Sequence, residues 1–159
     1  MARVGFDPTI VSDATALYPL GLILEYNGSW YRYLLNSDQA TAAGDAMHPT
    51  ATVTTANGGT AETVNNRLVA TGGTPASVCN TAISGIAVGV VAAGSYGFFL
   101  VNGYYAAVKC AAGVTAGDTL TCSTATDRYV MTIAAATSKP CGVARTSAAA
   151  NLCGAYITI

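Results

Sequence analysis

The fold is predicted best by residues 85–122, GIAVGVVAAGSYGFFLVNGYYAAVKCAAGVTAGDTLTC. Within them an Asn102-Gly103 dipeptide separates two apolar runs, and Asn-Gly with both residues at φ > 0 forms the type I′ turn of a β-hairpin. The pattern predicts antiparallel strands over 96–101 and 104–110, with alternate residues on opposite faces. One face is expected to hold Phe99, Val101, Tyr104, Ala106, Val108 and Cys110, and the other Phe98, Leu100, Tyr105, Ala107 and Lys109.

Parts of this stretch recur on both sides of it. Residues 20–47, LGLILEYNGSWYRYLLNSDQATAAGDAM, repeat the order of apolar strand, Asn-Gly turn, aromatic strand and Ala-Gly-Asp, and residues 142–154 match residues 85–97 without a gap. The corresponding turns are Asn27-Gly28 with Asn102-Gly103, and Gly44-Asp45 with Gly117-Asp118. Short strands between Gly, Asn and Asp turns predict an all-β fold, a small barrel or sandwich of antiparallel strands.

The first hairpin is expected to turn at Asn27-Gly28, pairing Leu24 with Tyr31 and Glu25 with Trp30. The same register pairs Leu22 with Tyr33 and Ile23 with Arg32. Trp30 then lies on the polar face, and exposed tryptophans are enriched at contacts with partners. A loop that covers Trp30 is the alternative.

The remaining chain divides by composition. Residues 1–19 show neither helical nor alternating periodicity and are expected to form an extended arm. Residues 20–159 are expected to form one β domain. Within it, about 39–80 are rich in Ala, Thr and Gly and predict a long excursion with brief strands at 50–55 and 67–71. Later strands are expected at 128–133, 141–145 and 155–159.

The charge content indicates a protein that works by contact. The 159 residues are 52% hydrophobic and only 9% charged, with a net charge of −1, against a usual charged share of roughly 25%. So little charge predicts that part of the surface is hidden in an assembly. A chain without basic excess is not expected to bind nucleic acid directly.

The five cysteines, at 79, 110, 122, 141 and 153, are odd in number and contain no Cys-x-x-Cys pair. That spacing argues against a complete disulfide framework and against a zinc site, and favours free, mostly buried thiols. The N-terminus does not resemble a signal peptide, so synthesis in a reducing cytoplasm is expected.

Residues 68–108 contain no charged residue, a feature shared with membrane spans. Gly94, Gly97 and the predicted turn interrupt this stretch, and β-branched and aromatic residues dominate its apolar part. No membrane association is therefore expected.

The sequence shows no set of side chains that could act together in catalysis. His48 is the only histidine and lies close to Asp45. Asp118 fills the place of Asp45 in the repeat without any histidine, so both carboxylates are expected to accept backbone N–H groups and hold a turn. The sequence predicts no enzyme, and no catalytic, metal-binding or cofactor-binding residues.

The order LGLILEYNGSWYRYLLN…AAGD, GIAVGVVAAGSYGFFLVNG…VTAGDTL and CGVA…GAYITI resembles the small capsid decoration (cement) proteins of tailed bacteriophages, over residues 20–159. The resemblance implies a compact β-barrel-like domain that assembles, often as a trimer, outside the head and braces neighbouring major capsid protein subunits. It also implies location on the virion surface after synthesis in the host cytoplasm. A glycan- or receptor-binding module and another tail or neck protein of a phage are the alternatives.

The contact residues expected from these patterns lie on two hairpins and on the arm. Packing against a neighbouring copy or the shell is expected for Trp30, Phe98, Leu100, Tyr105, Phe6, Ile10 and Val11. The alternative is that both faces of the central hairpin are internal to the chain.

Overall fold

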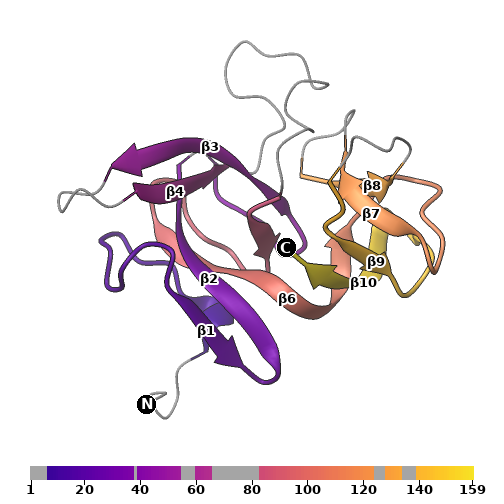
Figure 1. The fold of residues 1–159 in the computed structure, drawn as a ribbon, viewed down its shortest axis with the longest axis horizontal. Helices are drawn as coiled ribbons and strands as arrows, with labels where there is room; N and C mark the ends of the chain where they lie inside the picture. Colours follow the sequence, from indigo (N-terminus) through magenta and orange to yellow (C-terminus); the bar gives the residue numbers. More distant parts are fainter. Residues whose placement is uncertain (1–6, 38, 55–59, 66–82, 124–127, 134–138) are drawn as a thin grey trace.

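The computed structural model describes residues 7–37, 39–54, 60–65, 83–123, 128–133 and 139–159, with the backbone alone for 48–54 and 60–65. These residues form ten strands of one sheet, with almost no helix (Figure 1). The strands are β1 (Ile23–Tyr26), β2 (Ser29–Asn36), β3 (Ala46–Thr54), β4 (Thr60–Asn65), β5 (Gly85–Ala87), β6 (Tyr96–Lys109), β7 (Thr119–Cys122), β8 (Val130–Thr132), β9 (Gly142–Ala144) and β10 (Leu152–Thr158), and a short 3-10 turn, η1 (Pro8–Ile10), precedes them. The predicted all-β fold is confirmed.

The first hairpin is confirmed in detail. β1 pairs with β2 in the expected register, with Leu24 opposite Tyr31 and Glu25 opposite Trp30. Asn27 and Gly28 have φ values of 50° and 74°, the left-handed conformation that a type I′ turn requires of both central residues.

The predicted central hairpin is wrong, because β6 runs through Asn102-Gly103 as one strand of 14 residues. Its first part pairs with β2 and its second part with β10, and Asn102 lies opposite Trp30 on one side and Thr158 on the other. Two partner strands from distant parts of the sequence therefore replace the local turn. Gly103 is needed for a close approach instead, since a Cβ there would overlap the side chain of Ser29.

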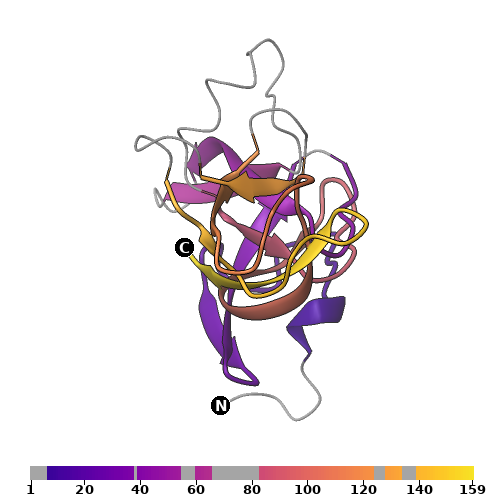
Figure 2. The same cartoon turned by 90° about the vertical axis from the view of Figure 1, so that its right-hand side faces the viewer.

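The strand pairing closes two rings that share β6. In the first ring β2, β6, β5, β3 and β4 follow one another, and β4 returns to β2 through a parallel pairing of Thr63 with Leu35. In the second, β6, β10, β9, β7 and β8 follow one another, and β8 returns to the end of β6 through a parallel bridge between Val130 and Cys110. β6 runs between the two halves in Figure 1, and Figure 2 shows the second half end-on, curved about a common centre.

The sequence repeat corresponds to a structural repeat. Gly44 N–H donates to the carbonyl of Ala87 at 2.7 Å, and Gly117 N–H donates to that of Ala144 at 2.8 Å. The strand that follows each Gly-Asp turn also keeps its register, with Ala46 opposite Ile86 in the first ring and Thr119 opposite Val143 in the second. β3 to β6 and β7 to β10 are thus two copies of one pattern.

Buried side chains cover both faces of the first part of β6. Phe98 and Leu100 belong to a large core cluster that extends into the second half, and Phe99 belongs to a smaller cluster with Leu34 and Met47. The expectation that Phe98 and Leu100 need a neighbouring molecule is therefore corrected. Since the strand does not fold back at Asn102, both faces of its first part lie inside the chain, as the alternative held for the whole hairpin, whereas Tyr104 in its second part is exposed.

The N-terminal segment crosses its own sheet from residue 7 onwards. Asp13 forms a β-bridge with Tyr96, and its carboxylate accepts the hydroxyl of Tyr33 at 3.0 Å. The ring of Tyr18 meets that of Tyr33 edge-on, with centroids 5.2 Å apart. These contacts cover the Tyr33 and Phe98 side of the first ring.

The predicted excursion at about 39–80 contains β3 and β4. The strand expected at 50–55 falls largely within β3, whereas the strand expected at 67–71 lies outside the described residues, and β4 occupies 60–65 instead.

Candidate interaction surface

The two repeated aspartates hold their turns as expected. Asp45 Oδ2 accepts the N–H of Ala42 at 2.8 Å, and Asp118 Oδ2 accepts the N–H of Thr115 at 2.8 Å. The hydroxyl of Thr132 adds a second donor to Asp118 at 2.7 Å. These hydrogen bonds lower the pKa of Asp118, because they stabilise the carboxylate form.

Asp45 has a further role that the sequence did not reveal. Its side chain is fully buried and lies 2.5 Å from Lys109 Nζ and 3.6 Å from Arg128 Nη1. Both cations belong to the second half. The Gly44-Asp45 turn is therefore joined to the second ring by charge as well as by packing. The sequence feature that could have indicated an ion pair was Lys109 itself, which is the first charged residue after the long uncharged stretch 68–108.

The described carboxylates of Asp13, Asp45 and Asp118 accept hydrogen bonds within the fold. Within the described residues, no three His, Cys, Asp or Glu side chains gather as they would to bind a metal ion. The backbone of His48 pairs with Asn65 in the sheet, and its side chain is outside the described part.

The described segments also contain no helix with the length and apolarity of a membrane span.

Four of the five thiols are free and buried, as predicted for Cys110, Cys122, Cys141 and Cys153. Burial raises the pKa of Cys141 and of Cys153 to about 12, because a thiolate loses its hydration in an apolar core. Such thiols are poor nucleophiles at neutral pH. Cys79 lies outside the described residues.

A row of exposed side chains crosses four strands of the second ring. Tyr104 on β6 lies opposite Tyr156 on β10, Tyr156 lies opposite Val143 on β9, and Val143 lies opposite Thr119 on β7. All four are exposed, and none carries a charge. Alternation explains this, because Ala155 and Ile157, the neighbours of Tyr156, point into the core.

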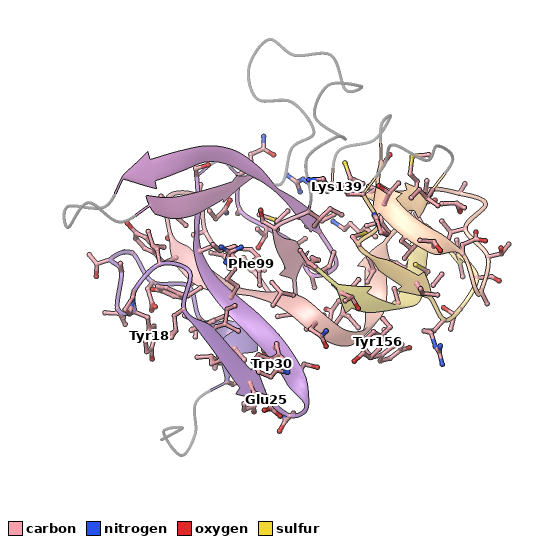
Figure 3. The ribbon with its side chains drawn as sticks, viewed as in Figure 1. Tyr18, Glu25, Trp30, Phe99, Lys139 and Tyr156 are labelled. Carbon is pink, nitrogen blue, oxygen red and sulfur yellow. The ribbon has the colours of Figure 1, made fainter. Side chains whose placement is uncertain are left out.

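The row continues toward the first hairpin through Asn102. The Tyr156 hydroxyl donates to Asn102 Oδ1 at 3.3 Å, and Asn102 is opposite Trp30, which is 48% exposed. Figure 3 shows Trp30 and Tyr156 on the same side of the molecule, with Glu25 beside Trp30. We call Trp30, Asn102, Tyr104, Val143 and Tyr156 the aromatic face.

The predicted contact residues are dispersed rather than gathered in one place. Ile10 is exposed, whereas Val11 is half-buried against the core. Tyr105 is half-buried, and its hydroxyl donates to the carbonyl of Val88 at 3.4 Å. Phe6 lies outside the described residues. Of the predicted set, Trp30 alone joins the aromatic face, and Tyr104, Val143 and Tyr156 were missed.

Comparisons with protein-family models, with curated proteins and with solved structures found no match. A functional assignment therefore depends on the residues themselves, and above all on the aromatic face.

Proposed function

We propose that this chain is a non-enzymatic virion structural protein, a decoration protein that binds the outside of a phage head and braces neighbouring major capsid protein subunits. The aromatic face is the observation that carries the proposal. It presents Trp30, Tyr104 and Tyr156 to solvent on neighbouring strands of a sparsely charged protein. Aromatic anchors of this kind are the residues that most often dominate protein–protein contacts.

The size of the face suits a role in binding. Burying one large apolar side chain is worth about 1.5 to 3 kcal/mol. Three aromatic side chains, each about half exposed, would recover part of that value and offset a share of the roughly 4 to 15 kcal/mol that association costs. Many copies on a repeating shell would add to the affinity through multivalency.

The non-enzymatic part of the proposal rests on how the carboxylates are used. Asp45 and Asp118 are each engaged by a turn N–H, and Asp45 also by two cations. Asp13 accepts the Tyr33 hydroxyl. These acids serve the fold, and the described side chains contain no cluster of three or more His, Cys, Asp or Glu.

Labelled protein imaged on particles of the phage that encodes it tests the proposal. A decoration protein is expected over the whole head in many copies, and Trp30→Ser should reduce its occupancy while the matched control Val90→Ser, another exposed apolar residue, should not. Label confined to one vertex would show a tail or neck protein instead. Particles without label would overturn the proposal.

A glycan-binding module is the second candidate, and the aromatic side chains around Asn102 favour it. Aromatic rings beside an amide are a combination that can stack on a sugar and hydrogen-bond its hydroxyls. Trp30 is the only tryptophan in the chain, so its fluorescence reports on this place alone. A saturable fluorescence change on titration with a panel of oligosaccharides, lost in Tyr156→Ser, would support this candidate over decoration.

A further inference from the structure

The dipeptide Asn-Gly occupies two very different places in the described part of the chain. Asn27-Gly28 forms the tip of the first hairpin, and both of its residues are exposed. Asn102-Gly103 lies inside β6, where the asparagine is half-buried and the glycine is buried. A third pair, Asn57-Gly58, is outside the described residues. Chemistry that belongs to the dipeptide should therefore proceed at the first place and be suppressed at the second.

An asparagine that precedes a glycine can lose its side-chain amide without an enzyme or a cofactor. The backbone nitrogen of the glycine attacks Cγ of the asparagine, so that a new N–Cγ bond closes a five-membered succinimide ring and the Cγ–Nδ2 bond breaks. The amide nitrogen leaves as ammonia, with the proton that the glycine nitrogen gives up. Water then opens the ring at one of its two carbonyls, which yields either an aspartyl residue or an isoaspartyl residue whose main chain runs through Cβ. Glycine favours the attack because it has no Cβ to obstruct the approach.

The surroundings of Asn27 leave this reaction open. Within the described part of the chain, no hydrogen bond holds the Asn27 side chain, and a Cβ placed on Gly28 would meet no atom within 4 Å. The ring closes only when the main chain of Asn27 leaves its left-handed conformation, so the turn has to open. β1 pairs with β2 at the end of the sheet order and contains no buried residue. A strand with so few buried contacts opens locally at small cost.

The surroundings of Asn102 oppose the same reaction. Its Oδ1 accepts the Tyr156 hydroxyl at 3.3 Å, and Gly103 pairs with Ile157 on β10. The Ser29 side chain lies directly against Gly103. Closing a ring at Asn102 would require β6 to leave its partner strands, which is an opening of the core and not of an edge.

We infer that Asn27 is a site of spontaneous deamidation, and that the isoaspartyl product undoes the tip of the first hairpin. The isoaspartyl residue adds one methylene group to the main chain, and a two-residue type I′ turn fits only the ordinary chain length. The pair of Glu25 with Trp30 is the second from the turn, so the change reaches the edge of the aromatic face. Either product also places a new negative charge close to Glu25.

The chain thus carries a slow, one-way change beside its only tryptophan. The reaction needs water but no partner, so it goes beyond the proposed function and does not rest on it.

The test follows the purified full-length chain at mildly alkaline pH, both folded and in urea. Protease digestion and mass spectrometry measure the fraction of each asparagine peptide that has exchanged NH2 for OH, and methyl transfer by an isoaspartyl methyltransferase marks the isoaspartyl product. In the folded chain, Asn27 should convert at least about tenfold faster than Asn102, because only Asn27 reacts after a small local opening. In urea the two should convert at similar rates, since the dipeptide is the same.

Asn27→Gly is the matched variant, because Gly-Gly also suits a type I′ turn and has no side-chain amide. The fluorescence of Trp30 should change in the wild type as Asn27 converts, and it should stay constant in Asn27→Gly. Freshly purified Asn27→Asp is the second variant and separates the two products, since it brings the charge without the longer main chain. Its Trp30 fluorescence should differ less from that of the fresh wild type than the fluorescence of the isoaspartyl fraction does.

Two results would overturn the assignment of the site. One is an equal rate for Asn27 and Asn102 in the folded chain, and the other is an Asn27 peptide that stays intact in the folded chain while the chain in urea converts. Trp30 fluorescence that stays constant while Asn27 converts, or that changes equally in Asn27→Gly, would overturn the loss of the hairpin tip.

Discussion

Adding one methyl group at Gly44 and one at Gly117 tests how the two halves are joined. The two glycines occupy the same place in the two repeats and have φ values of 89° and 96°. Alanine at either position costs about 1 to 2 kcal/mol of left-handed backbone strain. Around Gly117 a Cβ would meet nothing within 4 Å, whereas at Gly44 it would overlap the carbonyl oxygen of Ala107 and lie 3.1 Å from the N atom of Lys109.

Relief of that overlap has to move the first turn away from β6. The movement stretches the hydrogen bond from Lys109 N–H to the Gly44 carbonyl, now 2.9 Å, a bond worth about 0.5 to 1.5 kcal/mol. It also separates Lys109 from the buried carboxylate of Asp45, and full loss of one partner from a buried pair costs about 3 to 5 kcal/mol. With part of that pair lost, Gly44→Ala should lose about 2 to 4 kcal/mol more than Gly117→Ala.

Urea unfolding followed by circular dichroism measures the difference. With a slope of about 2 kcal/mol per molar urea, the midpoint of Gly44→Ala should lie about 1 to 2 M below that of Gly117→Ala. Gly117→Ala is the matched control, because it carries the same backbone strain without the overlap. Equal midpoints would refute the claim that the first turn is held against β6.

Four further predictions follow from burial and hydrogen bonding. Leu100→Asp should abolish folding and not merely yield a monomer, because the side chain is in the core; a folded, soluble variant by circular dichroism would contradict this. Iodoacetamide at pH 8 should leave Cys141 and Cys153 unmodified until urea is added, because burial raises the pKa of each thiol to about 12. Mass spectrometry measures the labelling, and rapid modification of either thiol in the folded protein would contradict the prediction. The pKa of Asp118 is lowered from 3.8, so the contribution of this carboxylate to stability is present above pH 3.8 and lost as the pH falls below that value. In a plot of unfolding free energy against pH, the acid side should therefore be shallower for Asp118→Asn than for the wild type. An unchanged slope would contradict this prediction. Burial raises the pKa of Tyr33 from 10.0 to about 12, so the contribution of Tyr33 to stability is complete below pH 10 and lost between pH 10 and 12. Absorbance at 295 nm, compared between the wild type and Tyr33→Phe, measures the ionisation of this phenol. Ionisation of Tyr33 near pH 10 would be the contrary outcome.

The first hairpin could be predicted because its information is local. Asn27 and Gly28 both adopt φ > 0, and the residues on either side alternate in the register that the structure has. The aspartate turns were predictable for a similar reason, since Asp45 and Asp118 each bond an N–H three residues earlier.

The central strand could not be predicted from local signals. Asn102-Gly103 has the same dipeptide and similar flanks, but β2 and β10 satisfy its neighbours from both sides, and tertiary pairing overrides the turn preference. The mistaken turn also placed Tyr104 on a core face, which hid the aromatic face. The repeat itself held a signal for the long strand. Residues 85–97 match residues 142–154, which contain β9 and the start of β10. The Gly44 turn follows β2 as the Gly117 turn follows β6, so β6 stands before the second repeat as β2 stands before the first.

The partners of Asp45 were beyond sequence reasoning for another reason. Lys109 and Arg128 lie 64 and 83 positions away along the chain (109 − 45 and 128 − 45). Their proximity depends on how the second ring sits against the first turn, which no periodicity records.

The strand that serves both rings restricts how a gene for this protein can change. One residue inserted into β6 would shift the register of two rings at once and turn every following side chain to the wrong face. Loss of β7 to β10 would leave the second part of β6 as an unpaired edge, open to aggregation. By contrast, the chain between the Gly-Asp turn and the next Gly-x-Ala strand is already longer in the first repeat than in the second. Insertions and deletions among descendants of this gene should accumulate within the repeats and spare their junction.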